Sequence, residues 1–173
     1  MAATEKKQIW FYSSDDNLAP NIVRGLIAAS QGIMMPGAPL YRSTSGTWKL
    51  CDTADGSDAW HGFLMNTISA EMAANTEIRI ALIQRRCTYA VFTENNGTDS
   101  AIAQSNVGNQ YGLTVSATSG QVGYTTLDLN NGHGIVDVVD IMSNLESIKF
   151  TTSDAPGVSL VKFTDAVIAA TKA

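Results

Sequence analysis

The sequence has few charged residues and no concentration of positive charge. Only 16% of its 173 residues are Asp, Glu, Lys or Arg, whereas soluble proteins average about a quarter. The eleven Lys and Arg are scattered, with adjacent pairs only at Lys6-Lys7 and Arg85-Arg86, and the net charge is −5. A protein that binds nucleic acid needs a dense basic face to neutralise phosphates. The charge distribution therefore excludes nucleic acid as a partner.

Long apolar runs are also absent. No run approaches the roughly 18 apolar residues of a membrane span, so we expect no membrane contact. Residues 1–7 lack the apolar core of a signal peptide, which predicts that the protein is made and kept in the cytosol or in a particle assembled there. The only cysteines, Cys51 and Cys87, are expected to stay thiols in a reducing compartment. A disulfide between neighbouring strands is the alternative.

Groups arranged for catalysis or metal binding are not recognisable. The two histidines, His61 and His133, have no neighbours that mark a nucleophile or a metal triad. Residues 52–58 resemble a calcium loop but lack alternating oxygen ligands and a closing Glu, which favours a solvated turn. Asp137 and Asp140 are three apart on a predicted strand, which places them on opposite faces. Without a Gly-rich phosphate loop or a Gly-x-Ser-x-Gly motif, we expect no enzyme, catalytic residue, cofactor or metal.

The pattern of turns and apolar runs predicts a mainly β protein. Short apolar or alternating runs are separated by Gly, Pro, Asn, Asp and Ser about every ten residues. Residues 22–84 hold about five such runs, enough for a small antiparallel β-barrel. The first run is bracketed by Pro20 and Gly32, and we predict a strand with a bulge at Gly25, since Gly weakens a helix interior. Residues 88–173 repeat the pattern and predict a second β-rich lobe.

One or two short helices are expected within the second lobe. Residues 100–107 predict a helix with Asp99 or Ser100 as its N-cap and Gly108 at its end. Residues 164–171 fit either a last strand or a second short helix.

The chain divides into a terminal arm and a larger β-rich part. We predict an arm over residues 1–20 and a single domain over 21–173, or two lobes over 21–84 and 88–173. The boundary between the lobes is placed at Gln84-Arg85-Arg86, where two charges, expected to be exposed, follow one buried strand and precede the next.

The arm carries three consecutive aromatic residues, Trp10, Phe11 and Tyr12. Exposed on an arm, they would favour aggregation unless covered, so they either fold back on the core of the chain or dock on a neighbouring subunit. Because aromatic residues dominate the energy of many interfaces, we predict that they anchor a protein interface. Trp48 and Trp60 lie on consecutive predicted strands, which suggests an alternative function, a carbohydrate-binding module in which the two rings stack on a sugar. The competing explanation for the two tryptophans is burial in the core.

The order of elements from Ile22 to Ile83 resembles a known family. The segments that carry the likeness are Ile27-Ala-Ala-Ser30, Gly37-Ala-Pro-Leu-Tyr41, Gly46-Thr-Trp-Lys-Leu50, Ala54-Asp-Gly56, Gly62-Phe-Leu64 and Asn75-Thr-Glu-Ile-Arg-Ile80. They are similar to tailed-bacteriophage head decoration (capsid cement) proteins, and residues 107–113 resemble the β extensions of larger members.

The resemblance implies a structural virion protein. Such a protein forms homotrimers at three-fold or quasi-three-fold axes, binds the major capsid protein on the capsid exterior and is made in the host cytoplasm. It has no catalytic residues to carry over. Another phage structural subunit, in the tail or in head completion, remains the alternative within the same class.

Overall fold

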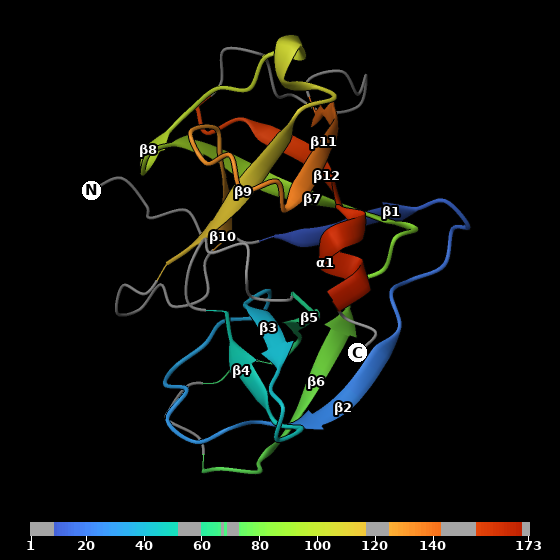
Figure 1. Cartoon of the computed structure of the whole chain (residues 1–173), viewed down its shortest axis with the longest axis vertical. Coiled ribbons are helices and arrows are strands. Elements are labelled where there is room, and N and C mark those ends of the chain that lie inside the picture. The colour runs from blue at the N-terminus through green and yellow to red at the C-terminus, as the bar shows by residue number, and fades with distance from the viewer. Residues whose placement is uncertain are drawn as a thin grey trace.

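The computed structural model describes residues 9–51, 60–66, 68, 73–116, 125–142 and 155–170. Over these residues the protein is mainly β, with two groups of strands and one short α-helix (Figure 1), as the sequence predicts. The predicted turn at 52–58 and residues 1–8 of the predicted arm lie outside the described residues.

The described residues between 22 and 82 form the lower lobe in Figure 1, a five-stranded antiparallel sheet whose order is β2-β6-β5-β3-β4. Its strands are β2 (Ile22–Leu26), β3 (Pro39–Arg42), β4 (Trp48–Leu50), β5 (Gly62–Leu64) and β6 (Glu77–Leu82). The two ends of the sheet meet at a bridge between Ile27 and Trp48, where the Ala28 N–H donates to the Trp48 carbonyl at 2.9 Å. This contact closes the sheet and confirms the small barrel predicted for residues 22–84.

Alternation along β6 shows how the barrel fills its interior. Ile78 and Ile80 are buried, while Glu77 and Arg79 between them are exposed, as side chains on opposite faces of a strand must be. The inward residues pack in one cluster with Ile27, Met34, Ala38, Leu40, Trp48, Leu64 and Ile68.

Gly25 does not make the predicted bulge. β2 pairs with β6 without a register shift, and Gly25 lies opposite Ile78. A Cβ atom at Gly25 would lie 2.2 Å from Nε1 of Trp48 and 2.9 Å from Cδ1 of Ile80. Glycine is therefore required here because the Trp48 indole packs directly against the backbone.

The close approach at Gly25 gives a first prediction. Gly25→Ala should lower the free energy of unfolding by about 1–3 kcal/mol, because an added methyl overpacks the barrel interior. Gly132→Ala is the matched control: its Cβ would have no neighbour within 4 Å, and we expect a change within about 0.5 kcal/mol. Urea denaturation measures both, and equal effects would contradict this role for Gly25.

The upper lobe in Figure 1 is a seven-stranded sheet built around β7. Its strands are β1 (Trp10–Ser14), β7 (Cys87–Asn95), β8 (Thr98–Asp99), β9 (Gln110–Val115), β10 (Thr125–Asp128), β11 (Val136–Ile141) and β12 (Val158–Phe163). Because β12 pairs with β7 as well as with β11, the path β7-β10-β9-β11-β12 returns to β7. The second lobe is thus also a closed ring, with β1 and β8 attached to β7.

The short helix predicted over residues 100–107 is found only as its last turn, and neither Asp99 nor Ser100 is its N-cap. The structure has a single 3-10 turn, η1 (Gln104–Asn106), preceded by Ala103 in extended conformation. The Asn106 side chain accepts from the Ala103 N–H at 2.9 Å and donates to the Tyr111 hydroxyl at 2.7 Å. Such local bonds compete with helix formation. Of the two options for residues 164–171, the helix is found, as α1 (Asp165–Ala170).

The expectation that Asp137 and Asp140 lie on opposite faces is also wrong. The pairing of β11 with β12 shifts register around Val139, so that Asp137 lies opposite Lys162 and Asp140 opposite Leu160. Leu160 and Lys162 are two residues apart and share a face of the sheet, so the two aspartates share it too. An extra residue in a strand resets the alternation.

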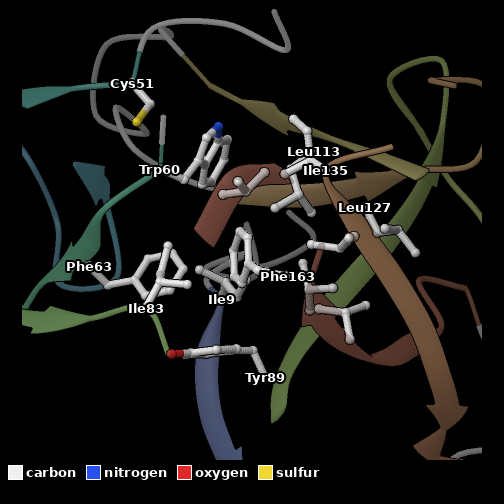
Figure 2. Packing of buried hydrophobic residues seen from close by; sticks show 14 of the residues in the cluster. Ile9, Cys51, Trp60, Phe63, Ile83, Tyr89, Leu113, Leu127, Ile135 and Phe163 are labelled. Atoms are coloured by element: carbon white, nitrogen blue, oxygen red, sulfur yellow. The ribbon is translucent and has the colours of Figure 1, made fainter. Parts of the chain in front are cut away.

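The two lobes share one hydrophobic core (Figure 2). Phe63 of β5 lies 5.3 Å from the ring of Tyr89 on β7 and 5.9 Å from that of Phe163 on β12. Trp60 lies 6.0 Å from Phe163, measured between ring centroids. The barrel and the upper ring are therefore joined by packed aromatic side chains.

Candidate interaction surface

The predicted interface residues lie on β1, at the edge of the upper sheet. β1 pairs antiparallel with β7, from Trp10 opposite Ala90 to Ser14 opposite Cys87, and with no other strand in the described part of the chain. One edge of β1 thus carries backbone groups that no described strand covers. Such an edge is a template for adding a strand from another chain.

The three aromatic side chains are each more than one-third exposed. The exposed fractions are 38% for Trp10, 37% for Phe11 and 37% for Tyr12. The Trp10 ring lies 5.5 Å from Phe92, and Phe11 meets Tyr89 edge-on at 6.4 Å. The segment therefore folds back on its own chain and still presents part of each ring to solvent. Their role as interface anchors remains a prediction.

A register shift distributes these rings around the edge. The pairing of β1 with β7 shifts between Phe11 and Ser13, so Tyr12 has no residue directly opposite. Trp10 and Phe11 are consecutive and point to opposite faces of the sheet. A strand added to this edge would therefore meet an aromatic ring on each face.

Buried residues fix β1 just before and at the end of the strand. Ile9 is 2% exposed and belongs to the shared core. Ser14 is also buried, and its Oγ lies 2.7 Å from the carbonyl oxygen of Leu18. The aromatic edge is thus ordered before any partner arrives, which lowers the entropy cost of binding.

Arg86 stabilises the turn that follows β1 through an ion pair and two hydrogen bonds. Its guanidinium pairs with Asp16 and donates to the carbonyls of Leu18 at 3.1 Å and Ala19 at 2.9 Å. The prediction of an exposed charge is wrong for Arg86, whose side chain is 24% exposed. These partners lie about seventy positions earlier in the chain, and local sequence carries no signal of them.

A second ion pair fastens the same turn to the sheet. Lys162 Nζ of β12 lies 2.8 Å from Asp15 Oδ1. Asp15 and Asp16 are thus each paired with a cation from a different strand or turn of the upper lobe.

The electrostatics of Asp16 yield a second prediction. Partial burial alone would raise the pKa of Asp16, but hydrogen bonds from the Leu18 N–H, Ser14 and Arg86, together with the Arg86 charge, hold it below its ordinary value of 3.8. A carboxyl whose pKa is lower in the folded protein than in the unfolded chain stabilises the folded state. This stabilisation is complete above the pKa of the unfolded chain and is lost as the pH falls through the pKa of the folded protein.

Asp16→Asn keeps the shape of the side chain and removes its titration. We expect the wild type to be more stable than Asp16→Asn by a constant amount above about pH 5, and the difference to shrink below about pH 4. Urea denaturation of both proteins between about pH 6 and pH 2.5 measures this difference. A difference that stays constant down to the lowest pH would contradict the assignment.

Burial suppresses the ionisation of two core groups. It raises the pKa of the Cys87 thiol and that of the Tyr89 phenol, which the neighbouring Cys87 raises further. Cys51 and Cys87 are buried and neither is in a disulfide. A buried, protonated thiol is a poor nucleophile, so Cys87 acts as a small core residue.

The two tryptophans do not form a sugar platform. Trp48 is 6% exposed inside the barrel, and Trp60 is 0% exposed in the shared core. The competing explanation, burial, is confirmed.

The histidines have structural contacts in different places. His61 Nδ1 accepts from the Arg42 N–H at 2.6 Å and its ring meets Trp48 edge-on. The His133 N–H donates to Asn131 Oδ1 at 3.0 Å. Among the described residues no group of three or more His, Cys, Asp or Glu is placed to hold a metal ion, and no helix there is long and apolar enough to cross a membrane.

A second exposed apolar group was not predicted from the sequence. It lies on the barrel and consists of Ile22, Leu26 and Met65, which are 48%, 45% and 41% exposed. Ile22 and Leu26 are four residues apart on β2, an even spacing that places them on one face.

Comparisons with known proteins do not assign this chain to a family. No protein-family model matches it, and no curated protein matches it either.

Proposed function

We propose that this chain is a structural virion protein that decorates and stabilises a phage capsid, as a homotrimer on the capsid exterior, by binding the major capsid protein. The observation that carries the proposal is the edge strand β1, which exposes Trp10, Phe11 and Tyr12 on an ordered backbone. The resemblance of residues 22–83 to decoration proteins supports it independently.

The β1 edge suits attachment to a repeated surface. A strand of the major capsid protein added to β1 would gain backbone hydrogen bonds, and the three rings would supply the apolar contact. Because a capsid presents many identical sites, multivalent binding strengthens modest contacts at each site. The shared aromatic core gives the bound protein the rigidity needed to brace neighbouring capsid subunits.

Sedimentation with capsids tests the proposal. Purified protein is mixed with expanded and with immature capsids of the virus that encodes it, and the pellets are analysed. We expect it to pellet with expanded capsids and not with immature ones. Binding to isolated tails or to head–tail connectors alone would assign it instead to another structural role, and binding to no virion component would reject the class.

A further inference from the structure

Three carboxylates form a row across the outer face of the upper lobe. Glu94 of β7 lies opposite Asp99 of β8 and also opposite Asp128 of β10. Residues opposite one another on paired strands share a face, and this face is the outer one, because Leu127, next to Asp128 in the chain, packs in the shared core. Neighbouring strands are about 4.8 Å apart, so the row is about 10 Å long.

The Glu94 side chain is almost covered, yet its carboxylate has no partner in the described part of the chain. Glu94 is 7% exposed, and no described residue gives its carboxylate a hydrogen bond or an ion pair. Among the described residues, the fully covered polar side-chain atoms without a partner are Trp60 Nε1 and Tyr89 Oη, so the Glu94 carboxylate still reaches the surface. A charged group so nearly buried is normally paired.

The described cations of the upper lobe do not neutralise the row. Arg85, Arg86 and Lys162 each pair with an aspartate outside it. The Asp128 carboxylate accepts two backbone N–H groups, which bring no positive charge. Because like charges opposite one another destabilise a sheet, a cation from another molecule would stabilise this part of the protein.

Aromatic side chains continue the same face of β7. Phe92 is two residues before Glu94, and Trp10 of β1 lies opposite Ala90, so both rings share the face of Glu94. The two rings are 5.5 Å apart, and Trp10 is 38% exposed. An arginine guanidinium binds a carboxylate through paired N–H groups and also stacks on aromatic rings. Both of these contacts are available on this face.

The arrangement favours a basic side chain over a metal ion. The ligands of a calcium or magnesium ion converge to about 2.0–2.6 Å from it, whereas the row is spread over three strands. Among the described residues no group of three or more His, Cys, Asp or Glu is placed in that way. A guanidinium can pair with Glu94 alone, while the two aspartates add attraction from either side.

We propose that the row of Asp99, Glu94 and Asp128 binds an arginine side chain of a partner protein. Glu94 pairs with the guanidinium, and Trp10 and Phe92 line the approach along β7. The identity of the partner, the major capsid protein, rests on the proposed function. The inference adds the chemistry that the docking segment of this partner must have, which is a basic residue next to the segment that covers the β1 edge.

Nuclear magnetic resonance on the isolated protein tests the arginine site without any capsid. The probe is the peptide acetyl-Arg-Gly-Arg-amide, and acetyl-Gln-Gly-Gln-amide is its uncharged control. We expect the arginine peptide alone to shift the backbone amide signals of Glu94, Asp99 and Asp128. Equal shifts with both peptides, no shift with the arginine peptide, or the same shifts with calcium chloride would overturn the inference.

Two variants with the same change in charge locate the site. Glu94→Gln should abolish the shifts caused by the arginine peptide. Asp165→Asn is the matched control, because Asp165 lies on α1, outside the row, and its side chain is 77% exposed; it should keep them. Circular dichroism confirms that each variant is folded. Shifts that persist in Glu94→Gln would overturn the inference.

Sedimentation with expanded capsids measures the role of the row in attachment. We expect Glu94→Gln to bind at least about tenfold more weakly than the wild type, since loss of one member of a covered charge pair is costly, and Asp165→Asn to bind as the wild type does. Undiminished binding by Glu94→Gln would overturn the inference and leave the proposed function standing. If the peptide binds at the row and capsids do not bind the wild type, the proposed function fails and the arginine site stands.

Discussion

Phe63→Ala should lower the free energy of unfolding by about 3–5 kcal/mol, the loss typical of truncating a buried Phe. Phe63 belongs to the barrel, is 6% exposed and packs against the rings of Tyr89 and Phe163 in the upper lobe. Truncation leaves a cavity where the two lobes meet. We therefore expect the loss to affect the whole chain, and both lobes of the wild type to unfold in one transition.

Phe11→Ala is the matched control for this experiment. This variant also removes a phenyl ring, but from a side chain that is 37% exposed at the edge of the sheet. The expected loss in free energy of unfolding is about 1 kcal/mol. Urea denaturation followed by tryptophan fluorescence and by circular dichroism measures both variants. Separate transitions for the two lobes, or equal losses in the two variants, would contradict the shared core.

Replacing Trp10 and Tyr12 together by Ser should weaken capsid binding by at least about 30-fold. Truncation of an aromatic anchor commonly costs about 2 kcal/mol or more of binding free energy, and this corresponds to about 30-fold in affinity. Both side chains are more than one-third exposed in the isolated chain, so their loss should leave the fold intact.

Val139→Ser is the control for capsid binding. Val139 is 41% exposed and lies on β11, a strand that does not pair with the edge strand β1. It should keep wild-type occupancy on the capsid. Deleting the whole arm would be a poorer test, because Ile9 is part of the shared core and its loss would destabilise the protein. Wild-type occupancy of the Trp10 and Tyr12 variant would rule out the β1 edge as the capsid-binding surface.

Local patterns predicted the strands well. The short apolar or alternating runs of residues 22–84, separated by turn residues, predicted about five strands, and the structure has β2, β3, β4, β5 and β6 there. These features depend on neighbours within a few residues, and turn residues mark their limits.

Features that depend on distant contacts were missed. Gly25 was assigned to a bulge, whereas it makes room for the Trp48 indole. That contact could not be predicted, because closure of the barrel is what places Trp48 against Gly25. Arg86 was expected to be exposed, but it is covered by its partners Asp16 and Leu18. These come from the turn after β1, far away in the sequence. The register shift around Val139 likewise follows from pairing with β12.

The candidate surface was predicted only in part. The sequence singled out Trp10, Phe11 and Tyr12 by their type, and the structure adds that they lie on a fixed strand with an open edge. The exposed apolar group of Ile22, Leu26 and Met65 was not predicted, since it depends on how β2 packs in the barrel and on which residues of neighbouring strands share a face.

If this protein attaches to the shell of a virion, expanded capsids should bind it in a fixed number of copies. The most direct test is to titrate expanded capsids with the purified wild-type protein and count bound copies per major capsid protein. We expect saturation at a fixed ratio, and the same ratio after excess protein is washed away. Protein that fails to bind, or that binds without reaching a fixed ratio, would contradict it.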